Sequence, residues 1–320
     1  MSNNLVQVLL IGAGAMSQDY AKVLMHQNVG FTVIGRGNIS AQRFHTETGI
    51  DVIQGGVQSY LEGNPTIPPA AIIAVGVEQL EATTILLLKA GIKRILVEKP
   101  AGINNKEIFR IAQEARSNNA EVFVAYNRRF YASTNKAIDI IRADGGVISF
   151  LFEFTEWNHV IETLNIDPRV KNNWFLANSS HVVDLAFFLC GDPVEISAFF
   201  TGSLSWHPSA SVFTGAGKTK NGALFSYHAN WAAPGRWGLE ILTAKHRLIF
   251  RPIEQLLIQE LGSITAEPVD LDGELDLKFK PGLYRQVHRF FSNSNSEGLI
   301  SVEEHLFRSE SVFAKICPQY

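Results

Sequence analysis

Residues 5–17 read LVQVLLIGAGAMS, an apolar run that leads directly into two glycines. The apolar part has the length of a buried strand, and the residues after it favour a helix. Gly12 allows a tight turn between them, and Gly14 lets a phosphate approach the backbone at the positive end of the helix. Ser17 stands where the dinucleotide fingerprint has its third glycine, and it is small enough for helix and strand to pack. This stretch predicts a strand–turn–helix unit that binds the pyrophosphate of a dinucleotide.

The pattern of short apolar runs and helical stretches continues to about residue 125. Such alternation is typical of βαβ units around a parallel sheet, so we expect an α/β, doubly wound Rossmann domain. Buried strands are predicted at residues 5–11, 31–34, 71–75, 94–97 and 121–125. The last two are joined by a predicted helix, capped by Asn104 or Asn105, whose apolar residues recur at helical spacing: Ile108, Ile111, Ala112 and Ala115.

After residue 126 the sequence changes to strand-like runs separated by turn residues. Short connections between successive strands favour a mainly antiparallel sheet, with one face covered by the helix that holds His181. The runs are residues 147–157, 195–205, 210–214, 223–231, 237–243 and 247–250, and helices are expected at 135–142, 181–189, 282–292 and 302–317. We therefore predict two domains: 1–125, which binds the dinucleotide, and 126–320, an α+β domain for substrate binding and oligomerisation.

Composition excludes several classes of function. The formal charge is −3 with 46% hydrophobic residues, so there is no basic excess to attract nucleic acid or an anionic membrane. Cys190 and Cys317 are too few for a disulfide framework, and neither they nor the nine histidines form a metal motif, so no metal is expected. The sequence has no secretory signal pattern and no apolar run of about 20 residues. We expect a cytoplasmic protein.

The end of the second predicted strand bears on the choice of cofactor. NAD-binding domains usually place a carboxylate there for the ribose hydroxyls, whereas this chain has Gly35 followed by Arg36. An arginine without a neighbouring acid can pair with a 2′-phosphate. The sequence therefore favours NADP, with NAD as the alternative, although a solvated arginine in a turn would look the same.

Several further motifs, taken in order, resemble the Gfo/Idh/MocA family, the glucose-fructose oxidoreductase and inositol dehydrogenase type. They are Glu98-Lys99-Pro100 at the end of the fourth predicted strand, the run YNRRF at residues 126–130, and His181 with Asp184 ahead of Gly191. The resemblance covers nearly the whole chain. It implies an open-faced C-terminal sheet that often mediates oligomerisation, so we expect a homodimer or homotetramer.

The resemblance also implies roles for individual residues. Lys99 is expected to reach the substrate carbon that exchanges the hydride, and His181 to stand beside it. Asp184, three residues further along the same helix, would orient substrate or support the imidazole. The expected cofactor contacts are Gly12, Gly14, Ala15, Met16, Arg36, Val75 and Glu98, and the expected substrate contacts are Tyr126, Arg128 and Asn178.

Departures from the family pattern narrow the substrate. Inositol-dehydrogenase-like members carry an aspartate four residues before the histidine, where this chain has Ala177, and a loop histidine where it has Leu80. Free inositol or glucose is therefore not expected. Arg128 and Arg129 are placed to meet a phosphate or carboxylate on the substrate, or else to form ion pairs at the domain junction. Arg236 and Trp237 would lie near the nicotinamide or hold the sheet together.

One motif resembles a nucleotide-binding loop but lacks its key features. Residues 215–219 read GAGKT, like the end of a phosphate-binding P-loop, but Val212 replaces the first glycine and a strand follows. We predict a hairpin turn there.

Together these observations predict an enzyme that moves a hydride between a nicotinamide and a ring hydroxyl or ketone of a sugar or sugar derivative, with Lys99 and His181 handling the proton. The chief alternative is a non-catalytic NAD(P)-binding regulator on the same fold. Reduction of an imine or a tetrapyrrole is a further alternative, and it would need a wide apolar pocket.

Overall fold

The computed structural model describes residues 7–292 and 296–317. Its contacts form two compact units. The first comprises the chain up to Tyr126 together with Lys278–Leu306, and the second comprises Asn127–Leu277 with the residues from Phe307 onward. The predicted boundary at 125/126 lies one residue before the first crossing between the units, at 126/127, and the return of the chain to the first unit near residue 278 was not predicted. The assignment of cofactor and substrate to separate domains stays a prediction.

The first unit is built on a sheet with the strand order β15-β6-β5-β4-β1-β2-β3 in the described part of the chain. The strands pair in parallel, except for β15, which is antiparallel to β6. Their bounds are β1 (Gln7–Ile11), β2 (Gly30–Ile34), β3 (Val52–Ile53), β4 (Ala70–Ile73), β5 (Arg94–Glu98), β6 (Glu121–Ala125) and β15 (Ile300–Ser301).

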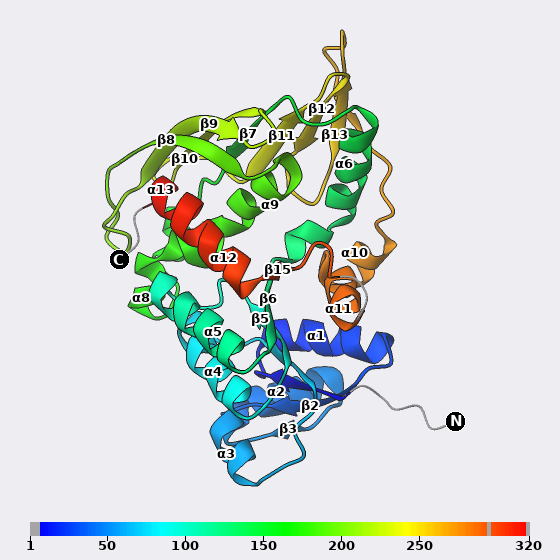
Figure 1. The fold of residues 1–320 in the computed structure, drawn as a ribbon, viewed down its shortest axis with the longest axis vertical. Helices are drawn as coiled ribbons and strands as arrows, with labels where there is room; N and C mark the ends of the chain where they lie inside the picture. Colours follow the sequence, from blue (N-terminus) through cyan, green and yellow to red (C-terminus); the bar gives the residue numbers. More distant parts are fainter. Residues whose placement is uncertain (1–6, 293–295, 318–320) are drawn as a thin grey trace. The chain divides into compact units, whose positions relative to one another are not determined.

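Helices enclose this sheet in two groups (Figure 1). In one group α1 (Ala15–His26) contacts α2 (Asn38–Thr48) and α11 (Leu283–Phe291). In the other α4 (Leu80–Lys89) contacts α3 (Gly56–Glu62) and α5 (Asn105–Ser117). The predicted doubly wound α/β architecture is confirmed. So is the cap of α5, where the Asn104 side chain accepts from the Glu107 backbone N–H at 3.1 Å.

The second unit is built on a sheet with the order β14-β13-β12-β11-β7-β10-β9-β8, again within the described residues. Its pairs are antiparallel except for β10 with β7, which is parallel. The bounds are β7 (Ser149–Glu153), β8 (Pro193–Thr201), β9 (Val212–Thr219), β10 (Leu224–Asn230), β11 (Gly238–Leu242), β12 (His246–Phe250), β13 (Leu257–Glu260) and β14 (Glu267–Pro268).

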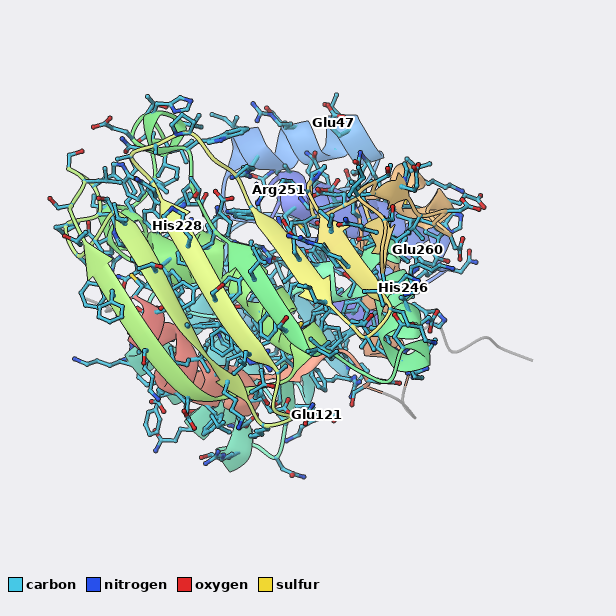
Figure 2. All side chains as sticks on the ribbon, turned by 90° about the horizontal axis from the view of Figure 1, so that it is seen from above. Glu47, Glu121, His228, His246, Arg251 and Glu260 are labelled. Carbon is cyan, nitrogen blue, oxygen red and sulfur yellow. The ribbon has the colours of Figure 1, made fainter. Side chains whose placement is uncertain are left out.

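One face of this sheet is covered by α9 (Ser180–Cys190), which contacts β7 and β11. Stacked aromatic rings fill the space between them: Phe150 and Phe152 from β7 both lie edge-on to Phe187 of α9. The opposite face is open, with Phe199 68% and Leu224 61% exposed. Figure 2 looks onto these strands and marks His228, on β10, and Arg251, which follows β12. The prediction of a mainly antiparallel sheet covered on one face is confirmed.

The remaining helices complete the two units. The α-helices are α6 (Ala132–Ala143), α7 (Asn158–Ile161), α8 (Pro168–Asn172), α10 (Glu274–Lys278), α12 (Val302–Arg308) and α13 (Ala314–Ile316). There are also two 3-10 turns, η1 (Val77–Gln79) and η2 (Asn127–Phe130), and two π-helical turns, η3 (Phe175–Ser179) and η4 (Ser309–Phe313). Within the described residues, no helix combines the length and the apolar character that crossing a membrane requires.

The predicted hairpin turn at residues 215–219 is wrong, because these residues lie inside β9. Their glycines are explained by close packing. A side chain at Gly215 would come within 2.4 Å of the Tyr227 hydroxyl, and one at Gly217 within 2.0 Å of the Glu195 carbonyl oxygen. The glycines therefore serve the strand pairing of β9 with β8 and β10.

Candidate functional site

A cleft of about 1030 Å³ lies in the first unit at the carboxyl ends of β1, β2 and β4. The chain crosses over between β1 and β4, and open α/β sheets bind ligands at such a switch point. The predicted cofactor contacts that line the cleft are Gly12, Gly14, Ala15, Met16, Arg36 and Val75. Sequence reasoning missed other lining residues, among them Ser40, Gly55, Gly56, Gln58 and Glu78.

The turn after β1 is built for close approach of a ligand. Gly12 has φ +116°, and a Cβ there would lie 2.3 Å from the Ala74 carbonyl oxygen. A Cβ at Gly14 would meet no protein atom within 4 Å, and Gly14 leaves the N-terminus of α1 without a side-chain cap. Uncapped N–H groups beside open space suit a pyrophosphate. The residues present therefore fit a dinucleotide.

Ser17 occupies the position of the third glycine in the dinucleotide fingerprint, and its contacts show why a serine fits there. Its side chain is fully buried, and its hydroxyl donates to the Ala74 carbonyl oxygen at 3.2 Å. The bond ties α1 to the residue after β4, so the serine joins helix and sheet at the position where a glycine would only allow them to approach.

The end of β2 is basic. Arg36 lines the cleft, and its side chain packs against Gly56, where a Cβ would lie 3.0 Å from the Arg36 Cγ. Gly55 and Gly56 have φ values of +99° and +79°, so this approach depends on the Gly-Gly pair, which is the signal that sequence reasoning overlooked. A neighbouring cleft of about 590 Å³ adds Arg43 to the same region.

Glu98 is the last residue of β5 and Lys99 follows it, and neither lines this cleft in the described structure. Glu98 instead accepts a hydrogen bond from the buried Tyr20 hydroxyl at 2.7 Å. Burial raises the pKa of Glu98, against the hydrogen bond from Tyr20 and the charge of Lys99. Lys99 is half-buried directly after the strand. Tyr126 is buried in the same unit, with its ring 5.5 Å from that of His305.

A second group of predicted site residues gathers around Trp237 in the second unit. His181 stands in the first turn of α9, immediately after the π-helical turn η3, and its ring centroid lies 6.2 Å from that of Trp237. The guanidinium of Arg128 lies 4.8 Å from the Trp237 ring, and that of Arg236 lies 4.5 Å from it. His181 and Trp237 are 6% and 5% exposed. The structure thus brings Arg128 and His181 to one aromatic ring.

Next to this cluster lies a buried carboxylate that sequence reasoning missed. Glu156 accepts from the Ser179 hydroxyl at 2.7 Å and from the Asn178 amide at 3.0 Å, and Arg236 lies 3.5 Å from it. Burial raises the pKa of Glu156, against the hydrogen bond from Ser179 and the charge of Arg236. Because it bonds the last two residues of η3, Glu156 fixes the backbone that leads into His181. Asn178, a predicted substrate contact, uses its amide N–H for this bond.

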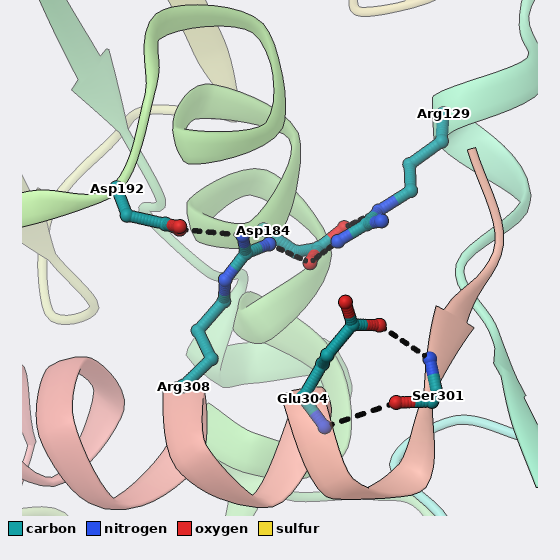
Figure 3. Close-up of polar contacts among 6 residues, drawn as sticks. All are labelled: Arg129, Asp184, Asp192, Ser301, Glu304 and Arg308. Atoms are coloured by element: carbon teal, nitrogen blue, oxygen red, sulfur yellow. Dashed lines mark hydrogen bonds and ion pairs between the residues drawn. The ribbon is translucent and has the colours of Figure 1, made fainter. Parts of the chain in front are cut away.

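Asp184 takes part in a different arrangement (Figure 3). Its carboxylate accepts from Arg129 at 2.7 and 2.6 Å and from Arg308 at 2.7 Å, and Arg308 also bonds Asp192 at 2.6 Å. Burial favours a high pKa for Asp184, but the charges and hydrogen bonds of Arg129 and Arg308 outweigh it and hold the pKa below its ordinary value. Arg129 was expected either to meet an anionic group of the substrate or to form an ion pair at the domain junction. The structure shows an ion pair, and both of its residues belong to the second unit.

Comparison with known proteins finds one family model that matches part of the first unit. Residues 6–126 match the family model described as an oxidoreductase family with an NAD-binding Rossmann fold, Gfo/Idh/MocA. No curated protein sequence matches the chain.

Solved structures resemble the whole chain in fold. An NAD-binding oxidoreductase from Klebsiella pneumoniae has a TM-score of 0.75 and 16% identity, with 97% of this chain and 96% of that one covered. An oxidoreductase from Agrobacterium radiobacter, in complex with NAD+, L-tartaric acid and magnesium, has a TM-score of 0.74 and 14% identity, with 98% of this chain and 94% of that one covered. UDP-N-acetylglucosamine 3-dehydrogenase from Acidithiobacillus ferrooxidans has a TM-score of 0.70 and 16% identity, with 97% of each chain covered.

Proposed function

We propose that the chain belongs to the Gfo/Idh/MocA family of oxidoreductases, whose NAD-binding Rossmann model matches residues 6–126, and that it transfers a hydride between a nicotinamide and a ring hydroxyl or ketone of a sugar derivative. The observation that carries the proposal is that the Gly12–Gly14 cleft lies at the carboxyl ends of β1, β2 and β4, and that Lys99 directly follows β5, the strand next to β4 in the same sheet. Among the structural relatives are sugar dehydrogenases, such as levoglucosan dehydrogenase in complex with NADH and levoglucosan.

The cofactor in this proposal is NADP(H). Gly12 and Gly14 would hold the pyrophosphate at the N-terminus of α1, and Arg36 would pair with the 2′-phosphate of the adenosine ribose. Support comes from the end of β2, where Arg36 and Ser40 line the main cleft and Arg43 lines the adjoining one. When bound, the nicotinamide supplies the hydride acceptor for oxidation or the hydride donor for reduction.

Lys99 handles the proton of the reacting hydroxyl, with His181 as its partner. A lysine can take up this proton only in its neutral form, which partial desolvation favours, and Lys99 is half-buried next to Glu98. Tyr20 fixes that carboxylate through its hydrogen bond. His181 is oriented by the π-helical turn before it and by Trp237. Asp184, held between two arginines, acts as a positioning residue for α9 in this scheme.

The substrate is a sugar derivative that carries an anionic group. Arg128, Asn178 and Tyr126 were expected to contact it, and Arg128 stands next to His181 on the ring of Trp237. Arg129 is occupied by Asp184, so the attraction for an anion falls to Arg128.

A panel of neutral and acidic sugars, followed by absorbance at the nicotinamide band, tests the proposed function. We expect NADP-dependent turnover of at least one acidic sugar derivative and its loss in Lys99→Met, with cofactor binding retained. Binding of NADP(H) without turnover of any member of the panel would favour the regulator instead.

We also propose that the open face of the β14–β8 sheet joins copies of the chain in a homodimer or homotetramer. Its exposed apolar residues include Leu151, Phe199 and Leu224, which a monomer would leave in water. Sedimentation analysis tests this: wild type should run as an oligomer and Phe199→Asp as a smaller species, whereas a monomeric wild type contradicts it.

A further inference from the structure

The Trp237 cluster consists of Trp237 with His181, Arg128 and Arg236 around it. Arg128 differs from Arg236 and from its sequence neighbour Arg129. Its guanidinium lies 4.8 Å from the ring of Trp237 and 6.0 Å from that of Tyr131, yet its Nε is buried without a hydrogen-bond partner. The described residues offer it no ion pair. By contrast, Arg129 is bound by Asp184, and Arg236 lies 3.5 Å from Glu156.

Arg128 as a whole is half-buried, but its buried Nε has no hydrogen-bond partner, which is costly, and such groups gather where a ligand completes them. The charged and titratable groups that act on Arg128 are Tyr131, Glu254, Arg236 and Glu156. Glu254 is exposed to water, and no ion pair joins it to Arg128. Burial lowers the pKa of Arg128 from its ordinary value, in keeping with a cation that lacks a partner.

The charge of the cluster indicates what kind of anion fits. Arg236 and Glu156 offset each other, which leaves one positive charge, that of Arg128. A phosphate brings about −1.5 to −2 charges, whereas a carboxylate brings one. The N–H fork of a guanidinium can bind two oxygens of either anion, so the charge decides between them. The single positive charge matches a carboxylate better than a phosphate.

We propose that Arg128 binds a carboxylate group of the substrate, so that the substrates of this protein are sugar acids or related hydroxy acids. The inference rests on the proposed function, because it takes the Trp237 cluster as the substrate-binding face. Trp237 is also the ring beside His181, so a carboxylate on Arg128 would place the rest of the substrate next to that imidazole. Arg128 and Trp237 together would then select the substrate and set its orientation.

Calorimetric titration with saturating NADP+ tests the proposal on matched pairs of probes: D-glucuronate with D-glucose, D-galacturonate with D-galactose, and D-gluconate with sorbitol, plus glucose 6-phosphate. At least one acid should bind wild type about 10- to 100-fold more tightly than its neutral partner, the range for a hydrogen bond to a charged group. Arg128→Met should abolish this preference without weakening the neutral probe. Arg128→Lys should retain part of it, because the lysine keeps the charge but loses the planar fork.

Arg251→Met is the matched control. Arg251 is a partly exposed arginine in the same unit, paired with Glu153, and its loss should leave the preference unchanged. The proposal is overturned if no acid binds more tightly than its neutral partner, if the phosphate binds more tightly than every acid, or if Arg128→Met keeps the wild-type preference.

These outcomes are separate from those of the proposed function. Binding preference is measured without turnover, and Lys99→Met should leave it intact. Lys99-dependent turnover of a neutral sugar without any carboxylate preference would keep the proposed function and refute the role of Arg128. A carboxylate preference without turnover of any probe would keep the role of Arg128 and refute the proposed function.

Discussion

Arg129 holds Asp184 with two parallel hydrogen bonds, from Nε to Oδ2 at 2.7 Å and from Nη2 to Oδ1 at 2.6 Å, and both side chains are almost fully buried. The pair joins the turn η2 to α9 within the second unit. Because α9 carries His181, the pair fixes the helix from which the proposed proton-handling imidazole projects. Arg308 adds a third bond and links Asp184 to Asp192.

Replacing Asp184 should therefore cost stability. In Asp184→Asn two buried arginines lose their shared counter-charge, and we expect the free energy of unfolding to fall by about 3 to 5 kcal/mol. Denaturant titration measures this. The control, Glu153→Gln, breaks an exposed ion pair of the same unit and should change the unfolding free energy by less than about 1 kcal/mol. Equal losses of unfolding free energy in the two variants would mean that the buried pair stabilises the fold no more than the exposed pair does.

The same carboxylate predicts a pH dependence. Its pKa is lower in the folded protein than in the unfolded chain, so its contribution to stability is present above the unfolded value near 3.8 and is lost as the pH falls through the folded value. The gap in unfolding free energy between wild type and Asp184→Asn should be constant above about pH 5 and should shrink below about pH 4. A gap that widens in acid would contradict the assigned direction of the pKa shift.

The two glycines after β1 should behave differently when replaced by alanine. Gly12→Ala places a methyl group 2.3 Å from the Ala74 carbonyl oxygen at a positive φ, so it should lower the free energy of unfolding and abolish NADP(H) binding. Gly14→Ala meets no protein atom, so stability should change by less than about 1 kcal/mol, while NADP(H) affinity falls about tenfold or more. Thermal unfolding and calorimetry measure the two effects. A wild-type affinity of Gly14→Ala for NADP(H) would contradict the proposal that this turn binds the pyrophosphate.

Arg36 should distinguish the two dinucleotides. In Arg36→Ala the affinity for NADP(H) should fall about 10- to 100-fold, whereas that for NAD(H) should change little, because only NADP(H) carries the 2′-phosphate. Arg142→Ala, at a surface arginine outside both clefts, serves as the control. A wild-type preference for NAD(H), or an unchanged affinity for NADP(H) in Arg36→Ala, would refute the assignment.

Periodicity and glycine placement predict most of the first unit, because buried parallel strands of four or five residues and amphipathic helices leave clear patterns. The apolar face of α5 and its cap at Asn104 are examples. The two-residue strands β3 and β15 carry no such pattern, since their pairing depends on neighbours far away in the sequence. The return of residues 278–306 to the first unit is likewise a property of tertiary packing, such as the contact of α11 with α1.

The candidate site was predicted less completely than the fold. Motif matching named Arg128 and His181 as candidates, but it missed Glu156, whose hydrogen bonds to Asn178 and Ser179 of η3 appear only in the folded chain. It also could not tell Arg128 from Arg129, which are adjacent in the sequence. One is paired with Asp184 and the other stacks on Trp237, and only the three-dimensional arrangement separates them.

The central claim is that Lys99 handles the proton of hydride transfer, and single-turnover transfer at saturating cofactor tests it most directly, because binding and release drop out of the comparison. The account predicts that Lys99→Met keeps its fold and its NADP(H) affinity while the transfer rate falls about 100-fold or more, and that adding His181→Ala does not multiply the loss. An unchanged rate of hydride transfer in Lys99→Met would contradict it.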